Sequence, residues 1–498
     1  MAQCPPFHAG ALGATLRVAC LAAGLFFVAL AQLVLAGVNH GAEPWFLALT
    51  SRVVRGDVLY RDVFFGSTPL AVWLTLPAVA IAGTEIIAVK AVVAFALAAQ
   101  GTGLVVAAVL AGLSERWALL LGLAVTVFAA RYPSAAYTPL AVAGAVWTAA
   151  ATLAYLRTHA PVLLAAAGAC AGVAMAAKYT VGIVALLIPV VAAPRLAARP
   201  LVTASGVVVA SLVPVAVTGG WPRFVEYAFA AKGTYLDVGR VSYFAPLKTA
   251  AVGIGELLTS PGRATVAAAV SDLAVWAPTL AMPLLAVAWL KRPDRRPALA
   301  VAGGLLAAAL AAAVPRFDLS HFLLIVSGPA FALAVAVHAL SAGRKGVSYA
   351  LFAVTCGIVL VCLAGNVPNG SSRFADLAGV RGVLVEDSIL KEWRDNARDL
   401  TVARQRFGPV MVVSNDAGLR YVLAGVANPT PFDFPLATAF GHDGEDAVAR
   451  SIAVGTIKAV CLDLRMDRAL RPERLAEAVR RHLRPRQRIG ECRLFTRT

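Results

Sequence analysis

The chain has 498 residues, of which 59% are hydrophobic and only 14% are charged. Soluble domains are about one quarter charged, so the composition excludes an ordinary soluble protein and indicates a polytopic membrane protein. The net charge of +17 could suggest a nucleic-acid partner, but the sequence has neither a basic groove interleaved with aromatic residues nor zinc-finger spacing, so we exclude one.

Charge is unevenly distributed along the chain. Residues 1–366 contain 34 charged side chains, whereas the shorter stretch 367–498 contains 37. The first stretch is therefore predicted to be a transmembrane domain, and the second a water-facing domain.

A membrane-spanning helix needs about 20 apolar residues. The first candidate, 16–38, has no small-residue cleavage site after it and is predicted to be an uncleaved helix. About eleven spans are predicted in all: 16–38, 86–113, 117–130, 137–157, 161–176, 179–194, 200–219, 272–291, 297–314, 320–341 and 347–366.

The short connections between these segments alternate in charge. One set contains Arg116, Arg157, Arg195, Arg199, Lys291, Arg292, Arg295, Arg296, Arg344 and Lys345; the other contains only Arg131, Lys178 and Arg316. By the positive-inside rule the first set is cytoplasmic. We therefore predict a multi-pass protein of the plasma (inner) membrane with a cytoplasmic N-terminus. An odd number of spans places 367–498 outside.

The first long outer connection, 39–85, is predicted to contain two interfacial helices. In 45–55 the apolar residues recur every three to four positions, with two arginines off that face. Pro77 interrupts the apolar run 70–83, which favours a second interfacial or re-entrant helix over a full span.

Acidic and basic side chains gather in this connection. Glu43 could be a general base for an acceptor hydroxyl or a metal ligand, but it could equally be a charge that favours the start of a helix. Arg61 could clamp a phosphate, with Asp62 orienting it or holding a cation. The alternative for that pair is a solvated turn with a local ion pair.

Two further clusters are predicted on the same outer side. Lys178, followed by Tyr179, could neutralise a phosphate or could extend to the surface from a helix end. Arg316, Asp318 and His321 could form a phosphate clamp, an acid–base pair or half of a metal site, or simply a capped helix start. The second long outer connection, 220–271, begins with many aromatic residues, which suits contact with headgroups or with a lipid-linked substrate.

The C-terminal stretch is predicted to be an α/β domain. Strands at 409–414, 458–464 and 488–496 alternate with helices at 388–407, 418–424, 445–454 and 472–483, which favours a small, mostly parallel sheet. No Gly-rich phosphate loop follows a strand. Cys461 and Cys492 lie on two of the strands, and we expect two unpaired thiols rather than a disulfide.

Short motifs across the chain carry a family resemblance. An acid after the first helix, then R-G-D-V-L-Y-R-D-V-F at 55–64, then a Pro-started apolar segment, resembles the polytopic C-type (GT-C) glycosyltransferases. The similarity is to the protein O-mannosyltransferase-like group, bacterial aminoarabinose transferases included. The segment 168–179 resembles a Gly-rich helix of that family that ends in lysine. Ala42 stands where the family often has Asp, and Ser67-Thr68-Pro69 where it has Lys-Pro-Pro.

The resemblance implies transfer of a sugar, with inversion, from a polyprenyl-phosphate carrier to an extracytoplasmic acceptor hydroxyl on a glycan, lipid or protein. It implies Glu43 as the base that activates the acceptor hydroxyl, Asp62 as a second catalytic carboxylate, and Arg61, Lys178 and Arg316 as phosphate ligands, with Tyr60, Tyr179, Asp318 and His321 contacting substrate. A divalent cation between Asp62 and the phosphate stays open. A lipid-linked-sugar flippase or transporter is the alternative, although no inverted repeat or midplane charge favours it.

Overall fold

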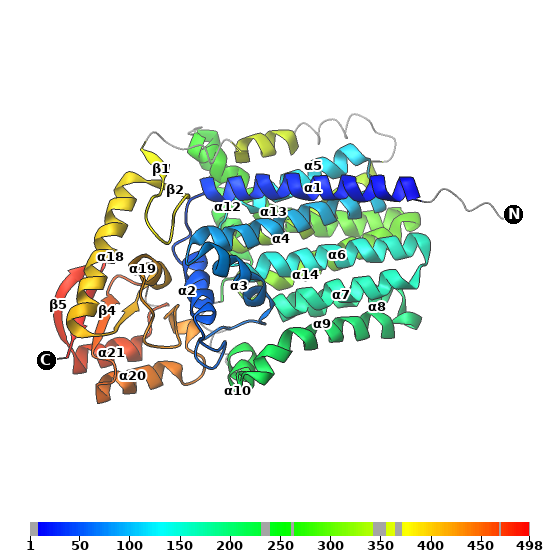
Figure 1. The fold of residues 1–498 in the computed structure, drawn as a ribbon. Coiled ribbons are helices and arrows are strands. Elements are labelled where there is room, and N and C mark those ends of the chain that lie inside the picture. The colour runs from blue at the N-terminus through cyan, green and yellow to red at the C-terminus, as the bar shows by residue number, and fades with distance from the viewer. Residues whose placement is uncertain are drawn as a thin grey trace.

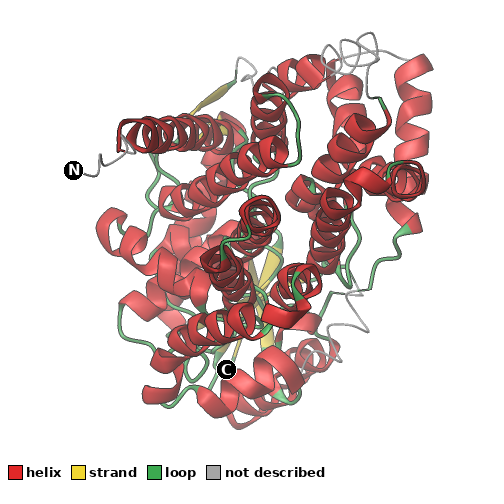
Figure 2. Cartoon of the chain, turned by 90° about the vertical axis from the view of Figure 1, so that its right-hand side faces the viewer, coloured by secondary structure: helices red, strands yellow, loops and turns green. Residues whose placement is uncertain are grey.

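Two parts make up the chain in the computed structural model, which describes residues 8–230, 240–259, 263–341, 355–363, 371–467 and 470–497. Apolar helices run side by side in a bundle, and an α/β unit covers one end of it, while helix α1 begins at the opposite end (Figure 1). Figure 2 looks along the bundle from that opposite end, with the strands lying behind the helices. We call the end that meets the α/β unit the capped end.

Ten of the eleven predicted spans lie on described residues, and each is helical. The helices are α1 (His8–Leu35), α4 (Ile86–Leu110), α5 (Glu115–Ala129), α6 (Tyr137–Thr158), α7 (Pro161–Ala177), α8 (Tyr179–Ala192), α9 (Ala198–Val217), α13 (Arg263–Lys291), α14 (Arg296–Ala313), α15 (Leu319–Ile325) and α16 (Ser327–Leu340). Most of the eleventh segment, 347–366, lies outside the described residues, and its described part, 355–363, is helical.

The described helices do not confirm the predicted number of spans. By length and composition, six of the described helices can cross a membrane, or seven if α15 and α16, bent by 59°, count as one span. Helices α7 and α8 are apolar but have only 17 and 14 residues. An α-helical integral membrane protein is therefore confirmed, a count of eleven is not, and the orientation relative to the cytoplasm stays a prediction.

The first outer connection contains the two expected short helices, α2 (Ala42–Val54) and α3 (Leu70–Ala82). However, the prediction that α2 buries one apolar face and exposes its polar face is wrong. Phe46 and Leu49 are fully buried, and Arg52 on the other face is only 8% exposed. Helix α2 packs against α3 and α4 of the bundle and also against α19 of the α/β unit, so both of its faces are covered (Figure 1).

The second outer connection folds back against the first. It contains α10 (Trp221–Val225), a π-turn at Glu226–Ala230 and α12 (Phe244–Thr259). The Phe224 ring lies 5.1 Å from the Tyr60 ring, and the Tyr227 ring 4.7 Å from the Phe64 ring. Phe224 and Tyr227 are therefore core of the capped end, whereas Trp221, Phe229 and Phe244 are exposed; Tyr235 lies outside the described residues.

Strands and helices alternate in the α/β unit, as the sequence predicts. Helix α18 follows from its pattern, because its buried residues, Leu390, Trp393, Ala397, Leu400 and Ala403, recur every three to four positions. The elements are β1 (Ser372–Phe374), β2 (Leu384–Glu386), α18 (Asp387–Phe407), β3 (Val410–Val413), α19 (Ala417–Ala424), α20 (Gly444–Val454), β4 (Ala459–Asp463), α21 (Glu473–His482), β5 (Arg484–Ile489) and β6 (Cys492–Thr496).

The prediction of a mostly parallel sheet is wrong. The main sheet has the order β3-β4-β6-β5, in which only β3 and β4 are parallel. The single strand predicted at 488–496 is a hairpin instead, with Gly490 in the left-handed region between β5 and β6. Strand β5 reads Arg-Pro-Arg-Gln-Arg-Ile and exposes its first five residues, so it lacks the apolar pattern of a strand.

The α/β unit is tightly docked on the first outer connection. An ideal Cβ on Gly418 of α19 would lie 2.5 Å from backbone atoms of Trp45, so only glycine permits this approach of α19 to α2. Two backbone hydrogen bonds cross the same junction, from Phe64 N to Pro431 O (2.8 Å) and from Ile86 N to Gly379 O (2.9 Å).

A disulfide joins Cys461 on β4 to Cys492 on β6, so the expectation of unpaired thiols is wrong. Their Cα atoms are 5.5 Å apart, within the range that a disulfide spans. Antiparallel pairing of β4 with β6 brings the two residues together, and the predicted parallel arrangement did not provide for this pairing. Disulfides persist in oxidising compartments, and the side of the membrane on which the unit lies stays a prediction.

Replacing both Cys461 and Cys492 with alanine is expected to lower the free energy of unfolding of the α/β unit by about 2–4 kcal/mol, because the bond closes a loop of 31 residues. Thermal unfolding of the full chain, with and without reductant, measures the loss. The double variant should not respond to reductant. An oxidised wild-type protein that melts at the same temperature as the double variant would contradict the expectation.

Candidate active site

Charged side chains predicted from the sequence lie in the connections at the capped end. The segment 57–63 forms a tight turn between α2 and α3, in which Asp62 N donates to Val58 O and Tyr60 N to Val63 O. Tyr60 has a φ of +69°, which is rare for a residue with a side chain. Its ring is fully buried, and its hydroxyl donates to Ser67 O at 2.6 Å, so Tyr60 holds the turn in place.

This turn places Arg61 and Asp62 at the protein surface. The Arg61 guanidinium makes two bonds to the Asp62 carboxylate, of 2.9 and 3.1 Å, and Val58 N donates to the same carboxylate. The bonds from Arg61 and then from Val58 lower the pKa of Asp62, so this carboxylate is ionised at neutral pH. Because 54% of the Arg61 side chain and 35% of that of Asp62 are exposed, both groups are accessible.

Lys178 separates α7 from α8 and extends toward α14. Its backbone is extended, which ends α7, and its Nζ donates to Ala312 O at 2.5 Å. The ammonium also lies 5.8 Å from the centre of the Tyr137 ring. Next to it, Ser67 and Thr68 donate hydrogen bonds to carbonyls at the end of α7. The segment 67–68 therefore lies beside Lys178.

Asp318 organises a third cluster, just beyond α14. It is the N-cap of α15 and accepts from His321 N (3.1 Å), while its carboxylate lies 2.8 Å from His321 Nδ1 and 2.6 Å from Arg316 Nε. Ser320 Oγ donates to it as well. Burial would raise the pKa of Asp318, but the hydrogen bonds and charge of His321 outweigh this, so the pKa is well below its usual range.

Two of these clusters are adjacent, and a series of aromatic rings leads from them to the third. Lys178 contacts Ala312 in the last turn of α14, and Arg316 N bonds to Ala313 O, so both cations lie at one helix end. Rings connect the Tyr60 turn to Tyr179 in the order Tyr60, Phe224, Phe229, Tyr179, with neighbouring centres 5.0–5.5 Å apart. The structure thus places Lys178, Tyr179, Arg316, Asp318 and His321 near the end of α14, with Tyr60, Arg61 and Asp62 at the other end of this series of rings; their functional roles stay predictions.

Glu43 lies elsewhere, in a fully buried ion pair. Lys90 Nζ donates to both Glu43 oxygens, at 2.8 and 3.1 Å, and to Gly37 O at 2.7 Å, while Asn39 N donates to Glu43 Oε2. Both side chains of the pair are 0% exposed. Burial raises the pKa of Glu43, and Lys90 opposes that rise. This pair fixes the start of α2 against α4.

Two important residues were missed by the sequence reasoning. Lys90 is the one charge inside the apolar run of α4, and an ionisable residue within such a run signals a buried partner. Arg52 donates to Asp57 (2.6 Å), to Thr430 O (2.7 Å) and to Asp62 O (2.9 Å), and it pairs with Asp433 at 3.2 Å. It thereby connects the turn that carries Asp62 to the α/β unit.

No group of three or more potential metal ligands occurs within the described part of the chain. The cavity between α2 and α19 is lined by none of Glu43, Asp62, Lys178 and Arg316. The arrangement at the capped end is thus a set of exposed or half-buried cations, each beside a carboxylate or a carbonyl, on a frame of aromatic rings.

No protein-family model and no curated protein matches the chain. Among solved structures, it is similar to ArnT from Cupriavidus metallidurans bound to undecaprenyl phosphate, with 17% identity and a TM-score of 0.45 over 93% of this chain and 85% of that one. The apo state of the same protein has 17% identity and a TM-score of 0.43, over 90% of this chain and 80% of that one. Arabinofuranosyltransferase AftD from Mycobacteria has 13% identity and a TM-score of 0.49, over 96% of this chain and 40% of that one. At these scores the similarities carry no argument about function, which rests on the side chains described above.

Proposed function

We propose that this chain is a membrane glycosyltransferase that transfers a sugar from a polyprenyl-phosphate carrier to an acceptor hydroxyl on the extracytoplasmic side, with inversion. The observation that carries the proposal is the placing of Arg61, Lys178 and Arg316 around one end of an apolar helix bundle, with accessible carboxylates beside them. A lipid tail fits against such a bundle, and its phosphate meets the cations where the bundle ends. The family resemblance in the motifs points to the same donor and acceptor.

The proposed reaction is a single displacement. The acceptor oxygen forms a bond to the anomeric carbon, the bond from that carbon to the carrier phosphate breaks, and a carboxylate takes the hydroxyl proton. Negative charge grows on the departing phosphate, and Arg61, Lys178 and Arg316 stabilise it in the transition state. Tyr179, Asp318 and His321 contact the substrates, while Tyr60 supports the turn.

The exposure of the two ion pairs decides which acid we assign as the base. An exposed pair such as Arg61–Asp62 contributes little to stability, so it opens at little cost and frees Arg61 for phosphate and Asp62 for the hydroxyl. Opening the buried pair Glu43–Lys90 leaves an unpaired charge inside the protein, at a cost of about 3–5 kcal/mol. We therefore assign the base to Asp62 and a positioning role to Glu43.

The test is a transfer assay with the full chain in lipid nanodiscs. A labelled polyprenyl-phosphate sugar is supplied with envelope extract as acceptor source, and release of polyprenyl phosphate is measured. Lys178→Ala is expected to reduce the rate about 10²- to 10³-fold, as the loss of one transition-state charge partner does. A chelator arm reports whether a divalent cation between Asp62 and phosphate is needed.

Intact donor that crosses the bilayer of a reconstituted vesicle without cleavage would identify a flippase and overturn the proposal. Release that is unchanged in the Lys178→Ala variant would remove Lys178 from the site.

A further inference from the structure

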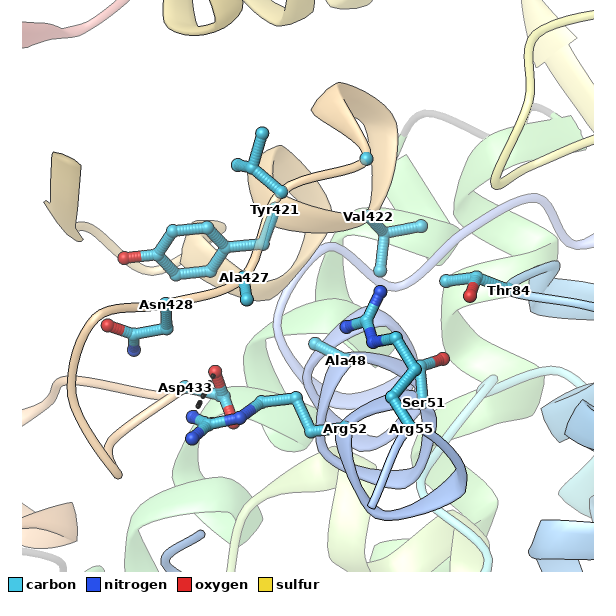
Figure 3. A pocket seen from close by; sticks show the side chains of 12 residues that line it. Ala48, Ser51, Arg52, Arg55, Thr84, Tyr421, Val422, Ala427, Asn428 and Asp433 are labelled. Carbon is cyan, nitrogen blue, oxygen red and sulfur yellow. Dashed lines mark hydrogen bonds and ion pairs between the residues drawn. The ribbon is translucent and has the colours of Figure 1, made fainter. Parts of the chain in front are cut away.

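A small cavity lies at the junction between the first outer connection and the α/β unit. It has a volume of about 50 Å³, and we call it the α2–α19 cavity. One wall comes from the end of α2, with Ser51, Arg52 and Arg55; another comes from the segment that follows α19, with Asn428 and Asp433 (Figure 3). It is separate from the proposed transfer site.

Ser51 carries the first sign of a ligand. Ser51 is 2% exposed, and its hydroxyl has no hydrogen-bond partner among the described residues. The neighbouring Thr50 does what a hydroxyl in a helix commonly does, donating to Phe46 O at 2.8 Å. Buried hydroxyls are nearly always satisfied. A hydroxyl that lines a cavity and makes no bond is therefore free to donate to a group inside it.

The arginines give the second sign. The Arg52 guanidinium is fully used by Asp57, Asp433 and two carbonyls. Arg55, one helical turn further on, makes no side-chain hydrogen bond or ion pair to any residue that the structure describes, and its side chain reaches the cavity. The favourable interaction of a cation with a helix C-terminus accounts for an arginine here but not for the unbonded hydroxyl beside it.

The charge balance of the walls selects the kind of ligand. The walls carry two arginines and one carboxylate, that of Asp433, which pairs with Arg52 at 3.2 Å; Asp57, outside the walls, pairs with the same arginine at 2.6 Å. The remaining positive charge belongs to Arg55, next to the free donor on Ser51. A metal cation would meet no unpaired carboxylate here, whereas an anion would meet a guanidinium and a hydroxyl, both of which donate to oxygen.

We infer that the α2–α19 cavity binds an oxyanion of phosphate size, held by the Arg55 guanidinium and the Ser51 hydroxyl. The anion lies between α2 and the segment 425–428, which lines the other side of the cavity, so the complete site forms only when the α/β unit is docked on α2. It comes either as a free inorganic ion or as the phosphate of an anionic lipid headgroup. The inference does not depend on the proposed transfer reaction.

The experiment uses the full chain in nanodiscs of zwitterionic lipid. Sodium phosphate is titrated against sodium chloride at constant ionic strength, and the melting temperature is followed. A ligand that binds only the folded state raises it in a saturable way. Arg55→Gln and Ser51→Ala are each expected to weaken the apparent affinity about tenfold or more, as the loss of a hydrogen bond to a charged group does. Arg55→Lys should retain part of the response.

The matched control is Arg480→Gln on α21, an exposed arginine outside the cavity, which should respond like the wild type. Repeating the titration in nanodiscs doped with an anionic phospholipid separates the sources. A reduced response to phosphate there, in the wild type but not in Arg55→Gln, identifies a lipid headgroup, whereas an unchanged response identifies a free ion.

Two results would overturn the inference. One is a wild-type melting temperature that does not rise in a saturable way with phosphate, or a rise that is equally large and equally tight in Arg55→Gln. The other is a Ser51→Ala variant that is more stable than the wild type and binds phosphate equally well, because the hydroxyl would then be an unsatisfied group and nothing more.

Discussion

Replacing Glu43 with glutamine is expected to lower the free energy of unfolding by about 3–5 kcal/mol. The substitution keeps the shape of the side chain but removes the negative charge that lies 2.8 Å from Lys90 Nζ. Because both side chains are 0% exposed, water cannot take over, and Lys90 is left as an uncompensated charge. Unfolding of the full chain in detergent, by heat or denaturant, measures the loss.

The second variant that makes this measurement decisive is Lys90→Met in the Glu43→Gln background. Methionine has a similar length and no charge, so the double variant should recover most of the lost stability. Arg61→Gln provides the matched comparison, since the exposed pair that it breaks contributes little to stability. If Glu43→Gln proved as mild as Arg61→Gln, the pair would not hold the start of α2.

Replacing Asp62 with asparagine is expected to reduce the rate of sugar transfer about 10²- to 10⁴-fold, the usual contribution of a positioned general base. Asparagine still accepts the hydrogen bond from Val58 N, so the turn should persist and the melting temperature should change little. The fall in rate should then appear in a protein that is still folded.

The same assay distinguishes Glu43 from Asp62 as the base. The stabilised double variant, Glu43→Gln with Lys90→Met, should retain substantial transfer activity if Glu43 only positions α2. Should that folded variant be inactive while Asp62→Asn remains active, the base is Glu43, as the family resemblance implies, and the assignment to Asp62 is wrong.

Much of the fold could be predicted from the sequence because its signals are local. Apolar runs located ten described helices, and alternating loop charge placed Arg61, Lys178 and Arg316 at one end of the bundle. The predicted count of eleven spans is not confirmed, since α7 and α8 are apolar but short. Strand β5 was missed because it is an exposed edge strand with a basic sequence.

What could not be predicted depends on packing between distant segments. A lysine inside α4 demands a partner, but nothing local identifies Glu43, 47 residues earlier, as that partner. Arg52 lies on the polar face of an amphipathic pattern, yet it is buried because Asp433, 381 residues later, meets it. The pairing of Cys461 with Cys492 likewise follows from the order of strands in the sheet, which no local pattern encodes.

The glycine contact between α19 and α2 limits how this protein can be rebuilt. A Cβ at position 418 has no room against Trp45, and Arg52 needs its acceptors at Thr430 and Asp433. An α/β unit taken from another protein would need both a glycine opposite Trp45 and acceptor oxygen atoms within reach of Arg52. The first outer connection and the α/β unit therefore have to be exchanged together, although the change in charge density near residue 367 marks an obvious place to divide the sequence.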